Sequence, residues 1–289
     1  MIEGIIVKGI AGFYYVKSDD GVIECKARGV FKKYGVKPMV GDNVRVEVKK
    51  DGGAVMISIG ERKNEFIRPP VSNVDFFIVT VAAAKPSPDF RLLDKVLLTA
   101  EKNGAGAIIC VNKIDIAAPS EVRLIEDIYE GIYPLICVSA LTGRGVDELR
   151  AAMTGGRYAF TGPSGVGKST LLNLLHPSAG AEMGELSKKT ERGRHTTRSA
   201  EIFEIETGVL VCDTPGFTAF STAIGSADEV MHLFPEIAKY YGKCKFKNCM
   251  HLEETGCAVR EAVKEGVIHL SRYDSYREIC REITDSKTY

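Results

Sequence analysis

A glycine-rich segment contains the residues whose types and spacing are best suited to chemistry. It reads Gly162-Pro163-Ser164-Gly165-Val166-Gly167-Lys168-Ser169-Thr170 and fits the pattern G-x-x-x-x-G-K-[ST] between a predicted strand and a predicted helix. The glycines allow backbone N–H groups to surround the phosphates of a nucleotide at a helix N-terminus, where the helix dipole favours anions. Lys168 would reach the β- and γ-phosphates, and the Ser169 hydroxyl would bind Mg²⁺. The alternative, a glycine-rich turn that fits by chance, does not account for the strand before it and the helix after it.

A second motif, Asn112-Lys113-Ile114-Asp115, indicates which base is bound. A carboxylate at Asp115 can accept hydrogen bonds from guanine N1–H and from the exocyclic amino group, whereas adenine lacks this pair of donors. Buried hydrogen bonding of this kind discriminates by roughly 10⁴-fold, because the wrong base leaves polar groups unpaired. Lys113 would lie along the base, and Ser139-Ala140-Leu141 would add a contact through a backbone N–H near Ala140. The two motifs together favour GTP over ATP.

An acidic motif, Asp213-Thr214-Pro215-Gly216, ends another predicted strand. At this position Asp213 would hold Mg²⁺ through water, and Gly216 would sense the γ-phosphate. The motif therefore predicts a phosphate-sensing switch.

The polar stretch Gly184–Ser199 precedes this motif and contains Thr196 and Thr197. One of these threonines, with Thr197 as our candidate, would give Mg²⁺ a second hydroxyl and close over the γ-phosphate; an ordinary flexible loop is the alternative. Phe217 follows the acidic motif where a glutamine would orient the attacking water. We therefore expect slow intrinsic hydrolysis, completed by a partner or by a group such as His195, which could equally contact RNA or have no role. Lys168, Thr197 and His195 are the candidate catalytic residues.

A cluster of metal-ligand types lies near the C-terminus, with the spacing Cys244-x₄-Cys249-x-His251-x₅-Cys257. Three thiolates and one imidazole form a closed tetrahedral set suited to one structural Zn²⁺ per chain. A disulfide and free thiols are the alternatives, and the cytosol disfavours the disulfide. Lysines that alternate with Phe246 beside Cys244 predict an RNA-facing knuckle.

These motifs require particular elements to position them, beginning with an all-β segment over residues 1–68. Alternating runs separated by turn signals predict five short strands: Glu3–Ile10, Phe13–Val16, Val22–Lys26, Asn43–Val48 and Ala54–Ile59. Five strands of this length suit a small closed barrel, for which the OB-fold is the commonest candidate. The segment Arg68-Pro69-Pro70 breaks the pattern and predicts a domain boundary.

Residues 69–220 alternate between strand and helix patterns, which predicts a mainly parallel sheet covered by helices on both faces. The expected strands are Asp75–Val81, Ala107–Val111, Leu135–Val138, Tyr158–Thr161, Ile202–Ile205 and Val209–Cys212. The expected helices are Leu92–Ala100, Ser120–Glu130, Val146–Met153 and Lys168–Leu175. Residues 221–289 predict a mainly helical, zinc-binding domain around the Cys/His cluster.

Composition and charge limit the partners and the cellular location that the sequence indicates. The chain has 289 residues and a formal net charge of zero, so the overall field does not indicate a nucleic-acid partner. Positive charge is local: residues 1–68 carry 13 Lys and Arg against 9 Asp and Glu, and a second cluster surrounds Arg194. Apolar stretches have the length of strands, and the N-terminus lacks a secretory pattern, so we expect a cytoplasmic chain with no membrane contact.

The order of the motifs is permuted, because the guanine motifs at 112–115 and 139–141 precede the phosphate loop at 162–169. This arrangement resembles the circularly permuted, small-subunit-dependent GTPases of the RsgA/YjeQ family across essentially the whole chain. The resemblance extends to five segments: Pro38-Met39-Val40-Gly41-Asp42, Arg68-Pro69-Pro70-Val71-Ser72-Asn73-Val74-Asp75, Gly193-Arg194-His195-Thr196-Thr197-Arg198, Asp213-Thr214-Pro215-Gly216-Phe217 and the Cys/His cluster.

The resemblance implies three domains: an N-terminal OB-fold barrel that binds RNA, a central α/β P-loop GTPase domain and a C-terminal zinc domain. It implies a switch that hydrolyses GTP to GDP and assists late maturation of the small ribosomal subunit, stimulated by that subunit. The expected partners are the small subunit and its rRNA, with Mg²⁺ bound alongside GTP, and we expect a monomer. The alternative is a GTP-gated module that binds RNA or protein away from the ribosome.

Overall fold

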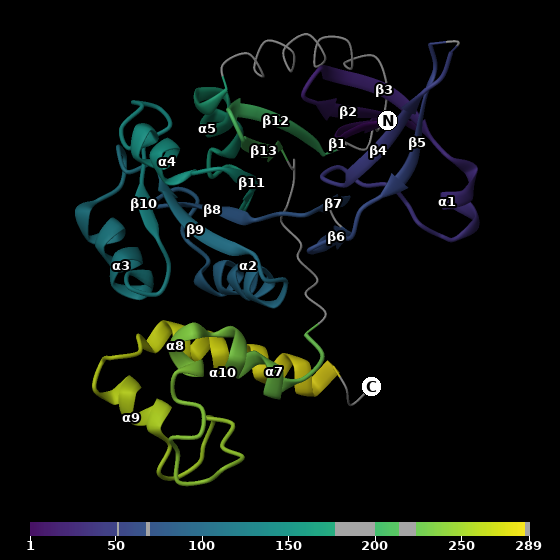
Figure 1. The fold of residues 1–289 in the computed structure, drawn as a ribbon. Coiled ribbons are helices and arrows are strands. Elements are labelled where there is room, and N and C mark those ends of the chain that lie inside the picture. Colours follow the sequence, from purple (N-terminus) through teal and green to yellow (C-terminus); the bar gives the residue numbers. More distant parts are fainter. Residues whose placement is uncertain (51, 68–69, 177–199, 214–223, 287–289) are drawn as a thin grey trace.

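The computed structural model describes residues 1–50, 52–67, 70–176, 200–213 and 224–286. It contains an N-terminal barrel, a central α/β unit and a C-terminal group of helices (Figure 1), and this confirms the predicted fold class. None of the helices in these ranges is both long and apolar enough to cross a bilayer. The domain boundaries near residues 68 and 220 stay predictions.

The barrel forms because alternate residues of five strands point inward. The strands pair in the order β1 (Ile2–Ile10), β2 (Phe13–Ser18), β3 (Gly21–Ala27), β5 (Ala54–Ile59) and β4 (Asn43–Val48), and β4 pairs back with β1 to close the ring. Ile6, Val16, Val46 and Met56 fill the interior and are fully buried. A short helix between β3 and β4, α1 (Gly29–Lys33), was not among the predicted elements.

The central sheet has six strands with the permuted connectivity expected. Their order is β10 (Leu135–Cys137), β9 (Gly106–Asn112), β8 (Phe76–Ala82), β11 (Gly156–Thr161), β13 (Val209–Asp213) and β12 (Glu201–Glu206). All neighbours are parallel except β12 and β13. The carboxyl ends of β8, β9 and β11 therefore meet at one edge, where the guanine motif and the phosphate loop follow.

Helices cover both faces of this sheet. Apolar side chains of α2 (Phe90–Lys102) and α3 (Pro119–Tyr129) pack on one face with Phe77 and Val79 of β8. Those of α4 (Val146–Ala152) and α5 (Lys168–Leu175) pack on the other face with Ile78. The period-two pattern of β8 thus supplies both cores, as a buried parallel strand must.

The barrel and the central sheet join into one sheet of eleven strands, because β1 pairs antiparallel with β12. Two ion pairs flank the joint: Lys8 Nζ lies 2.7 Å from Glu201 Oε1, and Lys17 Nζ lies 2.6 Å from Glu204 Oε2. Separate strand patterns in the sequence did not predict this continuity.

A small hairpin of β6 (Glu65–Ile67) and β7 (Pro70–Ser72) connects the barrel to β8. Asp42, which is fully buried, accepts hydrogen bonds from Arg62 Nε at 2.7 Å and from Ser72 Oγ at 2.7 Å. Arg157 of β11 donates to Gly41 O at 2.9 Å. The connection is therefore held by polar contacts that are partly or fully removed from water and are correspondingly costly to break.

The C-terminal helices form a core of their own beside α2 (Figure 1). They are α7 (Ala227–Leu233), α8 (Pro235–Ala238), α9 (Ala258–Lys264) and α10 (Leu270–Ser286). The Ser226 hydroxyl caps α7 by accepting from Glu229 N, and Leu98 of α2 belongs to this core. The C-terminal group therefore packs against the same helix that covers the central sheet.

Candidate nucleotide and metal sites

The phosphate loop runs from the end of β11 to the start of α5, as the sequence predicts. Gly162 has φ +135°, and a Cβ there would lie 2.1 Å from Thr80 O; Gly167 has φ +101°, and its Cβ would lie 2.3 Å from Asn112 Nδ2. Both positions therefore require glycine, through backbone conformation and through close approach of neighbours. The loop ends at the N-terminus of α5, where the helix dipole favours phosphate.

Lys168 folds back over this loop. Its Nζ donates to Gly162 O at 2.6 Å and to Pro163 O at 2.7 Å. Burial lowers the pKa of Lys168, and the nearby carboxylate of Asp213 acts in the opposite direction. The ammonium group is thus held by two neutral carbonyl oxygens. A bound phosphate can replace them, because its hydrogen bond to the ammonium group is charge-assisted and stronger.

Asn112 joins the phosphate loop to both guanine motifs. It is almost fully buried; its Nδ2 donates to Val166 O at 2.8 Å, and its Oδ1 accepts from Lys113 N at 2.8 Å and Ala140 N at 2.9 Å. Both polar atoms of the side-chain amide are therefore used, in three hydrogen bonds, to hold backbone in place. The sequence motif placed Asn112 at the site but did not indicate this role.

The remaining guanine-motif side chains are also held in place. Asp115 Oδ1 accepts a hydrogen bond from Ser139 Oγ at 2.6 Å, and Ser139 Oγ accepts one from Thr142 N at 3.1 Å. Lys113, with φ +65°, donates from Nζ to Lys85 O at 2.5 Å. Sequence reasoning missed the segment around Lys85, because it has no motif of its own.

A cavity of about 200 Å³ lies behind the phosphate loop. Its described lining includes Pro86, Leu92 and Leu93 on one side and Pro163 and Val166 on the other. The loop before α2 and the phosphate loop are therefore neighbours in space.

Some predicted site residues lie outside the described residues. They are His195, Thr196, Thr197, Gly216 and Phe217. Ser169 and Thr170 lie at the start of α5, and Asp213 is the last residue of β13. All three residues therefore lie on the elements that the sequence predicted for them.

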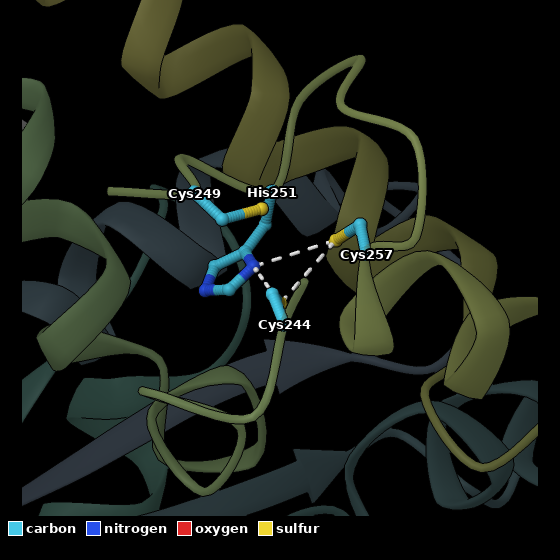
Figure 2. Close-up of side chains that lie close together, drawn as sticks. All are labelled: Cys244, Cys249, His251 and Cys257. Carbon is cyan, nitrogen blue, oxygen red and sulfur yellow. Dashed lines mark hydrogen bonds between the residues drawn. The ribbon is translucent and has the colours of Figure 1, made fainter. Parts of the chain in front are cut away.

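The four C-terminal ligand types converge in space (Figure 2). Their ligand atoms all lie within 4.8 Å of one another, and His251 Nδ1 is 3.4 Å from both Cys244 Sγ and Cys257 Sγ. Tetrahedral ligands about 2.0–2.3 Å from a zinc ion would be about 3.3–3.8 Å apart, so the cluster is close to the spacing that an ion needs. This group can bind a metal ion.

Comparisons with known proteins identify the family. A family profile described as RsgA GTPase matches residues 59–223, and one described as RsgA N-terminal domain matches residues 3–56. The chain belongs to the RsgA GTPase family. It is a GTPase, and its guanine motifs precede its phosphate loop, as in a circularly permuted GTPase.

Relatives and solved structures cover the whole RsgA-family chain. A protein of Caldanaerobacter subterraneus subsp. tengcongensis named small ribosomal subunit biogenesis GTPase RsgA is 43% identical over 99% of this chain and 97% of its own length. A relative of the same name from Agathobacter rectalis is 40% identical over the full length of both. YjeQ from Thermotoga maritima is 33% identical with a TM-score of 0.83 over 98% of both chains. YloQ, described as a circularly permuted GTPase, is 34% identical with a TM-score of 0.81 over 99% of this chain and 96% of its own.

The metal-ligand loop of this RsgA-family chain is held by α10 and by the first residue of α9. Tyr273 Oη donates to His251 O at 2.9 Å and Leu252 O at 3.0 Å, and Tyr276 Oη donates to Met250 O. Ala258 N donates to Cys244 Sγ at 3.3 Å. Such outer contacts orient metal ligands and raise the affinity of a site for its metal ion.

Burial shifts the pKa values of two of the ligands, Cys249 and His251. It raises the pKa of the Cys249 thiol to about 12 and lowers the pKa of His251. Metal binding requires a neutral imidazole and deprotonated thiols, so it is coupled to release of the Cys249 proton.

Proposed function

We propose that the chain is a GTPase that acts in the biogenesis of the small ribosomal subunit and is stimulated by that subunit. The observation that carries the GTP part is the set of Asn112 hydrogen bonds, which bring the phosphate loop and both guanine motifs into one site. The subunit part is supported by the name of relatives that match over the full chain. We also propose that it works as a cytoplasmic monomer.

The site residues then have distinct roles. Asp115 and the Ala140 backbone read guanine, Lys113 lies along the base, and residues 162–170 hold the phosphates. Mg²⁺ would be held by Ser169 and Thr197 directly and by Asp213 through water, and Gly216 would follow the γ-phosphate.

Hydrolysis moves the γ-phosphoryl group of GTP to water and releases GDP and phosphate. Lys168 stabilises the negative charge that collects on the β–γ bridging oxygen as its bond to the γ-phosphorus breaks. A partner, or His195, would orient the attacking water in the absence of a glutamine at Phe217.

Phosphate release from GTP should be measured at fixed salt for the pure protein alone and with isolated small or large ribosomal subunits. We expect the small subunit alone to raise turnover by about tenfold or more, since a partner that completes a GTPase site can contribute 10³–10⁵-fold. Lys168→Ala protein serves as the control for contaminating GTPases. Equal turnover in all three mixtures would remove the ribosome from the proposal and favour a GTP-gated module with another partner.

We propose that the Cys244, Cys249, His251 and Cys257 group holds one structural Zn²⁺ per chain. The donor set supports this, because three thiolates and one imidazole suit zinc and leave no open coordination position. A bound zinc ion would cross-link the loop and would take no part in the hydrolysis of GTP.

Contact with rRNA is supported by an exposed loop next to this cluster. Lys243, Lys245 and Lys247 are exposed, and so are Tyr241 and Phe246, at 61% and 49%. Lysines bind phosphates, and exposed aromatic rings stack on unpaired bases. We name residues 239–248 the basic knuckle.

Replacing Lys243, Lys245 and Lys247 together with alanine should weaken small-subunit binding and flatten its salt dependence. Each lost phosphate contact lowers the slope of log affinity against log salt by about 0.7–0.9, so three contacts would lower it by about 2 to 3. The measurement is a binding titration at several salt concentrations. Lys264→Ala is the control, because Lys264 pairs with Glu261 on α9. An unchanged slope in the triple variant would exclude the basic knuckle from the RNA contact.

A further inference from the structure

Among the residues that the structure describes, Arg272 is the largest fully buried side chain, and it lies where the C-terminal helices meet the central unit. Its guanidinium donates through Nε and Nη2 to Glu236, at 2.7 and 3.2 Å, and through Nη1 to Asp94. It also lies over the rings of Phe234 and Tyr129, 4.5 and 5.4 Å from their centroids. Arg272 is therefore enclosed by two carboxylates and an aromatic cage.

The members of this cage come from both units. Glu236 lies on α8 and Arg272 on α10, whereas Asp94 lies on α2 and Tyr129 ends α3. Tyr129 Oη donates to the same Asp94 oxygen that Arg272 contacts, at 2.7 Å. Asp94 Oδ2 is buried and has no hydrogen-bond partner among the residues that the structure describes. Arg272 is thus the cation that balances Asp94 and joins α2 to α3.

Both helices lead directly to the guanine half of the nucleotide site. Asp89 caps α2, and the loop just before it supplies the Lys85 carbonyl that accepts from Lys113 Nζ. The other helix, α3, begins shortly after Asp115 on the chain. A shift of α2 against α3 would therefore move the Lys85 carbonyl that holds Lys113 and the chain segment that leads from Asp115 into α3.

We propose that Arg272 is a positioning residue for guanine recognition, which fixes α2 and α3 from the C-terminal helices and so aligns Lys113 and Asp115. This inference rests on the proposed role of Asp115 in reading guanine. It gives the C-terminal helices a part in nucleotide selectivity, in addition to the contacts proposed for the basic knuckle. Without Arg272, the carboxylates of Asp94 and Glu236 would remain buried without a cation. The helices that carry these carboxylates would then separate.

The test compares GDP with inosine diphosphate, which keeps N1–H but lacks the exocyclic amino group. Dissociation constants of both should be measured for the zinc-loaded full chain by competition with a fluorescent guanine nucleotide. We expect wild type to prefer GDP by about 10- to 100-fold, the worth of one hydrogen bond to a carboxylate. Arg272→Met should reduce this preference by about tenfold, because Asp115 no longer holds its place.

The ratio separates positioning from mere loss of stability. If a fraction of the molecules is unfolded, the apparent affinities for both diphosphates fall by the same factor, and their ratio does not change. Parallel weakening, or no change, would overturn the inference. A wild-type ratio near one would instead overturn guanine reading by Asp115, and the present inference with it.

Two further variants complete the test. Arg277→Met is the matched control, because Arg277 is on the same helix but contacts Tyr273 and Asp274 within it. It should keep the wild-type ratio. If Arg272→Met does not fold, Arg272→Lys takes its place: an ammonium keeps the charge but cannot donate as a fork to Glu236 while reaching Asp94. We expect an intermediate ratio for Arg272→Lys, and a wild-type ratio would overturn the inference.

Discussion

Replacing Asp115 with asparagine should change the preferred base from guanine to xanthine. Asparagine can still accept from Ser139 Oγ, which now donates to Asp115 Oδ1 at 2.6 Å, so the side chain should keep its orientation. Its amide N–H₂ would face the guanine amino group, donor against donor, but would pair with the carbonyl that xanthine carries at that position. A site built on such hydrogen bonds rejects the mismatched ligand by roughly 10⁴-fold, and we expect a change of that order in the GDP-to-XDP ratio.

Competition binding with GDP and XDP measures this ratio directly. Asp127→Asn is the matched control, because Asp127 lies on α3 and pairs with Arg123 at the surface. It should behave as wild type. Retention of the GDP preference in Asp115→Asn would mean that Asp115 does not contact the base.

Removal of the metal should unfold the C-terminal helices while the central sheet stays folded. The ligand loop has little apolar core of its own, and metal binding contributes about 10–16 kcal/mol of folding free energy in isolated zinc modules. Tyr273 and Tyr276 bind the backbone of this loop, so its loss also exposes α10. We expect Cys249→Ser to lose the ion and the C-terminal part of the unfolding transition.

Metal content by atomic emission and thermal unfolding followed by circular dichroism provide the two readouts. Cys280→Ser is the control, because Cys280 is buried in the same helical core but lies outside the metal cluster. It should keep one zinc per chain and lose only about 1–2 kcal/mol, as a small polar change in a core does. Wild-type unfolding by a metal-free Cys249→Ser protein would refute a structural ion.

Most elements could be predicted because their periodicity is strong. The strands Asn43–Val48 and Ala54–Ile59 and the helix Lys168–Leu175 have the predicted bounds, and the other predicted elements differ by only a few residues at their ends. Pro70 was expected to break the pattern, but it is the first residue of β7, a position at which strands tolerate proline.

Long-range partners could not be predicted. An aspartate within the apolar repeat of α2 signals a buried charge, but nothing near Asp94 indicates that its partner is Arg272, 178 residues away. The guanine motif likewise identifies Asn112, yet its bond to Val166 depends on how β9 and β11 lie across the sheet. Local patterns fix elements, whereas these contacts depend on how the elements pack.

The joint between β1 and β12 has a consequence for how the GTPase unit can exist by itself. A strand at the border of a sheet presents unpaired N–H and C=O groups that recruit other chains, and proteins cover such borders. Here the barrel covers β12, and Lys8 and Lys17 neutralise two of its glutamates. A central unit produced without the barrel would therefore expose β12 as an unpaired edge strand that can pair with other copies. The barrel thus also protects the enzyme against aggregation.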